Sequence, residues 1–258
     1  MLVMLNAYLD RGTKSDAEEE AMTIACAIFK RTPYKQFTRA WNPTLSAWNA
    51  KSFHATDFYN GAGEFKRDTP ERERLFEVDS KRIPGMLGNA IYRGHTFQFN
   101  PAEFNRVAPP GWLDRYGSSV HAHAVHICLV FNGFWRQTTC PSEKFAYFIE
   151  SGELGIGETS AMVEKIRNHP LSGPIVRVSS FAQVEKGFAY GTDVADFMAW
   201  HWNKFYIDKY KTGQQAKPRL DYQAFIEAAG DKLKHTWVTG AALEKFFSLT
   251  PMYEEPRS

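Results

Sequence analysis

Hydrophobic residues near the start of the chain form short continuous runs. Residues 2–9 (LVMLNAYL) are almost entirely apolar and lead into Asp10, a pattern typical of a strand that is buried on both faces and opens into a site at its end. A second apolar run covers residues 21–29, after a polar turn at 13–20. The short link between the runs predicts two strands that pair antiparallel.

Apolar positions at helical spacing follow. These positions are Phe37, Trp41, Leu45 and Trp48, and their spacing predicts a helix. Pro43 is tolerated in such a helix only near its start. Residues 52–58 are compatible with a strand or a loop. The same patterns predict helices over residues 71–92, 114–135, 158–167 and 191–206, and strands over residues 95–99, 145–149 and 175–178.

This order of elements predicts an α/β fold, with a mixed central sheet flanked by helices. After about residue 209 the chain is first polar and then amphipathic around Phe225 and Phe246. We therefore expect a main domain over residues 1–208 and a helical C-terminal extension over residues 209–258 that packs on it.

Composition narrows the function classes. The net charge of +2 over 258 residues excludes bulk electrostatic attraction to nucleic acid, so such binding would need a local patch. Three cysteines without a CxxC spacing exclude a disulfide framework and a cysteine zinc site. The first residues lack a basic start, and no apolar run approaches the ~20 residues of a membrane span. We expect a cytoplasmic protein with no membrane partner.

Carboxylates stand at the ends of predicted strands. Asp10 and Glu150 each follow an apolar strand, and Asp193 and Asp196 lie in the first turns of the helix predicted over 191–206. Sites in α/β sheets form beyond the carboxyl ends of strands. Acids gathered there repel one another and persist mainly where divalent cations neutralise them, and two such cations commonly hydrolyse phosphodiesters. Alternatively, Asp10 starts a turn and Asp193 caps a helix.

The segment His54-Ala55-Thr56-Asp57 adds an imidazole and a carboxylate three residues apart. The pair could polarise a water molecule or complete a metal shell, and it could equally be a hydrogen-bonded structural pair.

Four segments resemble motifs of the DUF3800 family, prokaryotic and phage-associated proteins with a ribonuclease H-like fold. The matching segments span roughly residues 4–205 and read AYLDRG, FHATDF, YFIESG and DVADFMAW. The resemblance implies a metal-binding cluster in which Asp10 is central, Glu150 and Asp196 are further ligands, Asp57 lies nearby and His54 orients water. The family usually has Asp-Glu-Ser-Gly where this chain has Asp10-Arg11-Gly12, and Asp193 adds a carboxylate where the family has Gln.

The leading hypothesis is a nuclease or phosphodiesterase that depends on Mg²⁺ or Mn²⁺ held by Asp10, Glu150, Asp196 and Asp193, with catalytic support from Asp57 and His54. The alternatives are a non-catalytic member that binds nucleic acid or a protein, for instance in phage or mobile-element defence, and a hydrolase of small phosphorylated metabolites.

Most of the aromatic residues are expected in the core. A basic and aromatic strip near the end of the 191–206 helix could contact nucleic acid or be a solvated helix end. It consists of Lys204, Lys209, Lys211, Lys217 and Arg219 with Tyr206, Tyr210 and Tyr222.

Overall fold

Six strands form one mixed sheet in the order β5-β4-β1-β2-β3-β6. The computed structural model describes residues 4–11, 21–116, 119–152, 155–212 and 217–249. The strands are β1 (Met4–Arg11), β2 (Met22–Phe29), β3 (Arg93–Phe99), β4 (Lys144–Glu150), β5 (Val178–Val184) and β6 (Leu233–Val238). The pairs β1–β2 and β2–β3 are antiparallel, whereas β1–β4, β4–β5 and β3–β6 are parallel. The predicted antiparallel pairing of the first two strands is therefore confirmed.

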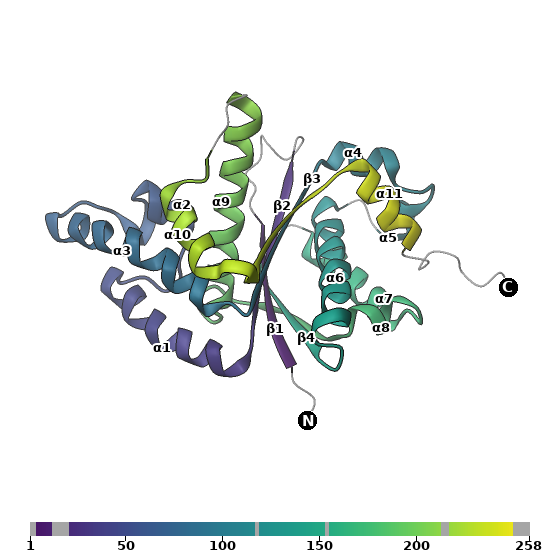
Figure 1. Cartoon of the computed structure of the whole chain (residues 1–258), viewed down its shortest axis with the longest axis horizontal. Helices are drawn as coiled ribbons and strands as arrows, with labels where there is room; N and C mark the ends of the chain where they lie inside the picture. Colours follow the sequence, from purple (N-terminus) through teal and green to yellow (C-terminus); the bar gives the residue numbers. More distant parts are fainter. Residues whose placement is uncertain (1–3, 12–20, 117–118, 153–154, 213–216, 250–258) are drawn as a thin grey trace.

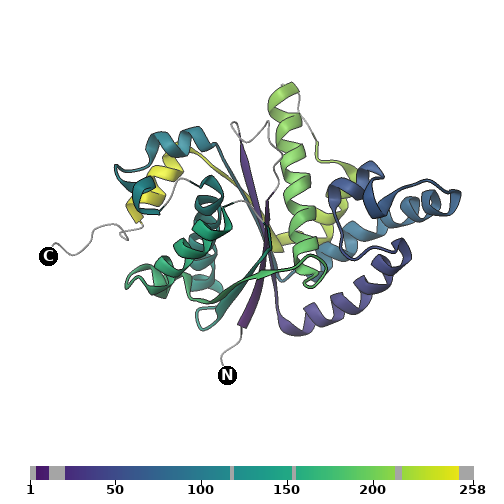
Figure 2. The same cartoon turned by 180° about the vertical axis from the view of Figure 1, so that it is seen from behind.

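Helices cover both faces of the sheet and make three layers (Figure 1). One layer contains α1 (Arg31–Trp48), α2 (Ala55–Asn60), α3 (Pro70–Ala90), α9 (Gly191–Thr212) and α10 (Leu220–Ala229). The other contains α4 (Pro101–Val107), α5 (Trp112–Tyr116), α6 (Val120–Thr139), α7 (Ile156–Asn168), α8 (Ser172–Val176) and α11 (Gly240–Leu249). Figure 2 shows the same division from behind. The predicted mixed α/β architecture is thus confirmed.

Alternation along β1 decides which layer each side chain enters. Leu5, Ala7 and Leu9 belong to the core beneath α6, whereas Tyr8 belongs to the core beneath α9. Since successive strand residues point to opposite faces, Asp10 shares the face of Tyr8. The carboxylate at the end of β1 therefore lies on the α9 side of the sheet.

Small residues let α9 approach this face closely. On β2 the residues under α9 are Ala25 and Ala27, and α9 contributes Ala195 and Ala199 to the same buried cluster. At the start of the helix, a Cβ on Gly191 would lie 2.1 Å from Cδ2 of Tyr8. Only glycine fits there, so the first turn of α9 is held against β1 beside Asp10.

Several predicted elements were wrong in type or extent. The helix around Trp41 begins at Arg31, so Pro43 lies inside α1 rather than near its start; its buried aromatic face outweighs the lost backbone hydrogen bond. Residues 52–58 contain no strand and enter α2. The helix predicted over 114–135 is divided into α5 and α6. Residues 175–178 end α8 and begin β5, because Arg177 adopts a left-handed backbone.

The C-terminal part of the chain joins the central sheet. Helix α9 continues past residue 208 to Thr212, and β6 then pairs in parallel with β3. The prediction of a helical extension missed this strand, whose sequence (LKHTWV) contains few apolar residues because most of it is only partly buried. Helix α10 packs on α3, where a Cβ on Gly88 would lie 2.6 Å from the carbonyl oxygen of Phe225.

The three cysteines, Cys26, Cys128 and Cys140, are buried free thiols. No described helix combines the length and the apolar character needed to cross a membrane.

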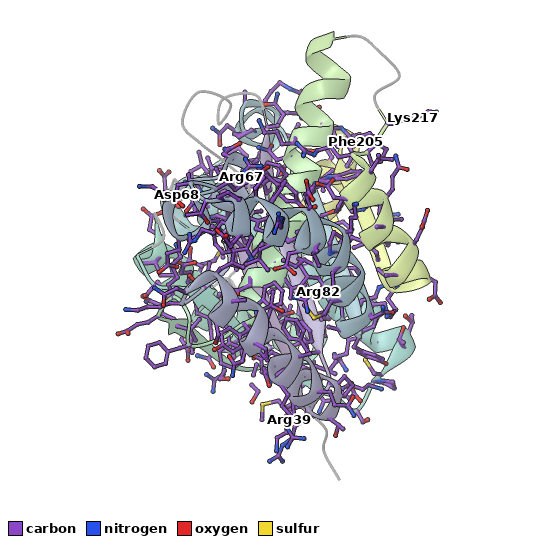
Figure 3. The ribbon with its side chains drawn as sticks, turned by 90° about the vertical axis from the view of Figure 1, so that its left-hand side faces the viewer. Arg39, Arg67, Asp68, Arg82, Phe205 and Lys217 are labelled. Atoms are coloured by element: carbon purple, nitrogen blue, oxygen red, sulfur yellow. The ribbon has the colours of Figure 1, made fainter. Side chains whose placement is uncertain are left out.

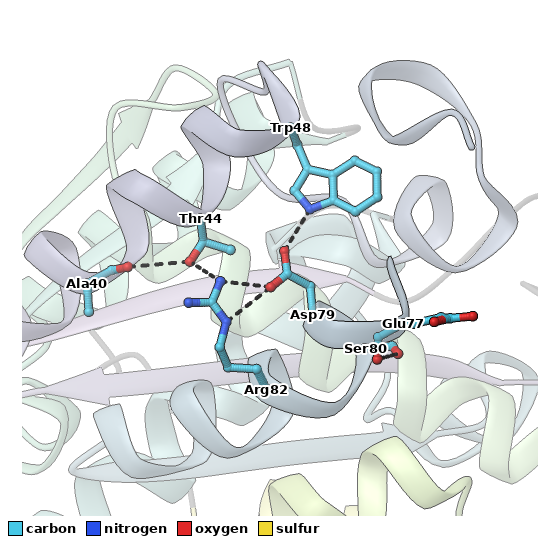
Figure 4. Close-up of polar contacts among 7 residues, drawn as sticks. All are labelled: Ala40, Thr44, Trp48, Glu77, Asp79, Ser80 and Arg82. Carbon is cyan, nitrogen blue, oxygen red and sulfur yellow. Dashed lines mark hydrogen bonds and ion pairs between the residues drawn. The ribbon is translucent and has the colours of Figure 1, made fainter. Parts of the chain in front are cut away.

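A buried acid joins α1 to α3 (Figure 4). The indole N–H of Trp48 donates to Asp79 Oδ2 at 2.8 Å, and Arg82 donates to Asp79 Oδ1 at 2.8 and 3.0 Å. Arg82 also donates to the hydroxyl of Thr44 at 2.8 Å. The side chain of Asp79 is 1% exposed, so each of its oxygens has a donor in place of water. Figure 3 shows Arg82 on this face of the molecule, with Arg39 and Arg67.

We expect Asp79→Ala to lower the free energy of unfolding by about 2–4 kcal/mol, because it leaves the buried Trp48 N–H without an acceptor and Arg82 without its carboxylate. Urea unfolding followed by tryptophan fluorescence measures the loss. Glu77→Ala, two residues earlier at an exposed position of α3, is the control and should change stability by less than about 0.5 kcal/mol. Equal losses in the two variants would contradict the role given to Asp79.

Buried histidines make the fold sensitive to acid. Burial lowers the pKa of His126 to about 3, with a smaller contribution from His123, and the ring of His126 stacks on Trp112. Its folded pKa lies below the unfolded value of about 6.5. The neutral form therefore stabilises the fold above pH 6.5, and this contribution is lost as the pH falls toward 3.

We expect His126→Phe to reduce the dependence of stability on pH by about 1.4 kcal/mol per pH unit between pH 6 and 4. Urea titrations at each pH supply the slope. His169→Phe, at a partly exposed position, is the control and should keep the slope of the native chain. A slope in His126→Phe as steep as in the native chain would refute the assignment.

Candidate functional site

Two neighbouring parallel strands deliver the first two acids. The register of β1 and β4 pairs Leu9 with Ile149, and the next residue on each strand is Asp10 and Glu150. Leu9 and Ile149 both enter the core beneath α6, so the alternation turns both carboxylates toward α9. The prediction that strand ends bring these acids together agrees with this arrangement.

Helix α9 supplies two further acids, one turn apart. Asp193 and Asp196 lie in its first turns, and Asp193 is 2% exposed. Asp196 Oδ2 accepts the backbone N–H of Ala55 at 2.6 Å, at the start of α2. His54 precedes that helix, and its Nδ1 lies 3.9 Å from Asp196 Oδ1. The start of α2 therefore orients one carboxylate of the cluster.

Asp193 has structural partners. Its Oδ2 accepts the indole N–H of Trp41 at 2.7 Å, and it accepts a hydrogen bond from the backbone of Phe53. Trp41 and Trp48 lie seven residues apart on α1, and each donates its N–H to a buried acid. Asp193 thereby links α1 to α9, and its carboxylate already accepts hydrogen bonds from the protein.

Burial raises the pKa values of these carboxylates, and neighbouring acids add to the shifts of Asp10 and Glu150. Burial, followed by the charges of Asp196 and Glu150, raises the pKa of Asp10 well above its ordinary value, although the backbone N–H and the charge of Arg11 oppose this. Burial raises the pKa of Asp196 to about 6, against the hydrogen bond from the backbone of Ala55, the charge of Lys186 and a hydrogen bond with Asp10. Burial and Asp196 also raise the pKa of Glu150. The site thus holds more negative charge than its surroundings compensate, and it favours protons or a cation.

Lys186 is a member of this site that the sequence reasoning missed. It lies two residues beyond β5, whose Val184 pairs with Glu150. Its ammonium group is attracted by Asp196, Asp193 and Asp10, while partial burial lowers its pKa. The predicted strand ended at residue 178, so no signal placed residue 186 beside Glu150.

Asp57 and His54 differ in their relation to the acids. Asp57 lies in α2, and its carboxylate faces Gly63, where a Cβ would lie 3.1 Å from Asp57 Oδ2. Within the described part of the chain it forms no hydrogen bond or ion pair with the acids of the cluster. His54, in contrast, lies beside Asp196, and its buried Nε2 has no hydrogen-bond partner among the residues that the structure describes.

Carboxylate oxygens are the ligand type that Mg²⁺ and Mn²⁺ prefer. Among the residues that the structure describes, however, no three His, Cys, Asp or Glu side chains are already arranged as a metal-binding group. The donor chemistry therefore fits a divalent cation, and binding would require Asp10, Glu150 and Asp196 to adjust their side chains.

The tyrosines of the expected basic and aromatic strip that the structure describes pack within the fold, whereas Lys204, Lys217 and Arg219 are exposed. Tyr222 was a candidate for stacking on a base, but it is 1% exposed and its ring stacks on His201, so it is not available for such contact. Tyr206 stacks on Trp237. Arg219 lies over the rings of Tyr59 and Trp200. The side chains of Lys209, Tyr210 and Lys211 lie outside the described residues.

A cavity of about 570 Å³ lies between α2, α3 and α10, and none of the four clustered acids lines it. Its walls are mostly apolar and include Tyr59, Phe76 and Leu220, with Lys81 and Arg219 among the lining residues. The cavity is therefore distinct from the acid cluster.

No family model matches the chain, and a search of curated proteins finds no matching relative. The resemblance to the DUF3800 family stays a prediction from the four motifs.

We expect Asp10→Asn to stabilise the protein at pH 8 by an amount on the order of 1–3 kcal/mol. Because the folded pKa of Asp10 is raised, the protonated carboxyl stabilises the fold below about pH 3.8, and this contribution is lost as the pH rises through the folded pKa. The amide mimics the protonated form at every pH. The gain measured by urea unfolding should therefore shrink toward pH 4.

Asp57→Asn is the matched control, since this acid lies apart from the cluster. It should leave stability at pH 8 within about 0.5 kcal/mol of the native value. A destabilised Asp10→Asn protein at pH 8 would mean that the charge of Asp10 is compensated in the fold.

Proposed function

We propose that this protein is a divalent-metal-dependent phosphodiesterase or nuclease with a ribonuclease H-like fold. The observation that carries the proposal is the gathering of Asp10, Glu150 and Asp196 at one end of the sheet, where burial raises the pKa of each and the charges of neighbouring acids further raise those of Asp10 and Glu150. Buried carboxylates with excess negative charge are costly for a fold, and a bound cation would offset that cost.

Strand topology supports the fold part of the proposal. Strands β1 to β5 stand in the order β3-β2-β1-β4-β5, with β2 antiparallel to its neighbours and β4 and β5 parallel to β1. This strand order supports the proposed ribonuclease H-like fold, in which β6 would be an addition at the β3 edge. Fold alone does not establish chemistry, so the activity rests on the acids.

Asp10, Glu150 and Asp196 would hold Mg²⁺ or Mn²⁺. When bound, such an ion would lower the pKa of a water molecule and neutralise charge on the phosphate. Asp193, fixed by Trp41, would maintain the position of the first turn of α9. The buried Nε2 of His54 would orient water or accept a proton beside Asp196.

Lys186 favours a second candidate function, a non-catalytic member that binds nucleic acid. An ammonium group attracted by three acids of the cluster partly supplies the charge that a cation would otherwise bring. In that protein the acid cluster would be compensated internally, and the exposed cations nearby would serve binding alone.

Hydrolysis of bis(p-nitrophenyl) phosphate by the full chain in Mn²⁺ distinguishes the two functions. We expect Mn²⁺-dependent hydrolysis that falls by about 100-fold in Asp196→Asn, because the variant loses a ligand charge. We also expect Mn²⁺ to raise the melting temperature of the native chain, and to raise it less in Asp196→Asn.

Asp68→Asn, an exposed acid in the loop before α3 (Figure 3), is the control and should behave like the native chain. Hydrolysis in Asp196→Asn equal to that of the native chain would place the activity elsewhere. No hydrolysis together with no thermal shift in Mn²⁺ would favour the non-catalytic function.

A further inference from the structure

A large aromatic side chain is exposed to solvent in the loop that leads into α9, the helix that carries Asp193 and Asp196. Phe188 is 80% exposed, and in the described part of the chain only Leu220, at 82%, exceeds it among large hydrophobic residues. Phe188 belongs to the loop that joins β5 to α9. Val184 of β5 pairs with Glu150, and α9 carries Asp193 and Asp196. The loop therefore connects two elements that take part in the proposed active site.

This loop is built as a defined turn. The backbone N–H of Phe188 donates to the carbonyl of Glu185 at 3.1 Å. Gly187 has φ +84°, and a Cβ there would lie 2.8 Å from the carbonyl oxygen of Lys51. Both the left-handed backbone and the close approach require glycine. The turn is thereby held against residue 51, and the outward direction of Phe188 follows from the fold.

Two lysines accompany the exposed ring. Lys186 precedes the tight glycine, and Lys51 lies against that glycine from the other side; both are exposed. The ammonium group of Lys186 is also attracted by the acids of the cluster. An aromatic face with neighbouring cations is the combination that binds a flexible polyanion carrying planar rings.

We infer that Phe188, Lys51 and Lys186 form a binding site for single-stranded nucleic acid beside the acid cluster, with an unpaired base stacked on Phe188 and phosphates contacted by the two lysines. A duplex hides the faces of its bases, so this ring selects unpaired nucleotides. The inference names the substrate class of the proposed function, and it rests on that function for the cleavage of the phosphodiester bond.

The test is fluorescence anisotropy of labelled phosphorothioate single strands, both DNA and RNA, with the full-length protein in Mg²⁺. Base stacking on an aromatic side chain contributes about 1–3 kcal/mol, so Phe188→Ala should weaken binding by about 5- to 150-fold. Phe188→Trp should retain it. Lys186→Gln and Lys51→Gln should each reduce the slope of log K against log salt by about 0.7.

Phe134→Ala is the matched control, since Phe134 is also exposed, at 37%, but lies on α6 at the opposite face of the sheet. It should bind as the native chain does. The inference is overturned if the native chain binds no single strand, if Phe188→Ala binds equally well, or if a duplex of the same sequence binds as tightly. A protein-docking or small-metabolite role for Phe188 would give the first of these results.

The binding of single strands and the hydrolysis of the small diester can be lost independently, so the two experiments test the inference and the proposed function separately. Loss of strand binding with Mn²⁺-dependent hydrolysis of the small diester retained would overturn this inference and keep the proposed function. Strand binding that depends on Phe188 without any hydrolysis would support the inference and remove the catalytic function.

Discussion

The close contact between the first turn of α9 and the end of β1 organises the whole molecule. Gly191 allows the helix to lie against Tyr8, and the alanines of β2 leave room for the turns that follow. A bulkier residue at 191 would lift the helix from the sheet. Asp193 and Asp196 would then move away from Asp10 and Glu150, and Trp41 would lose its acceptor. Packing and chemistry therefore depend on the same glycine.

The same contact places charge where the fold least tolerates it. Four carboxylates meet between α9 and the sheet, and burial raises the pKa of each of them. Asp79, by contrast, is a buried acid whose two oxygens both have donors, from Trp48 and Arg82. Asp79 is thus a structural acid, whereas Asp10 and its neighbours lower the stability of the fold. Acids that are retained at such a cost are characteristic of functional sites.

The sequence reasoning located Asp10 and Glu150 because both follow continuous apolar runs, and a strand end is a local feature. It also located Asp196, since the periodicity of α9 is strong. It could not find Lys186, because that residue joins the site only through the parallel pairing of β4 with β5, a contact between segments far apart in the chain. Strand β6 was missed for a related reason: its pairing with β3 satisfies the backbone while much of its surface stays partly exposed.

Tyr222 and Phe188 show why composition alone misassigns a binding surface. Tyr222 stands near lysines in the sequence, yet α10 turns it into the core against His201. Phe188 has only one sequence neighbour of positive charge, yet the fold brings Lys51 to its turn. Exposure of a ring depends on which face of an element packs, and local charge density is set by chain segments that meet in space. The nucleic-acid surface that we propose therefore lies at the loop between β5 and α9, which carries the exposed ring of Phe188 and follows the strand that pairs with Glu150.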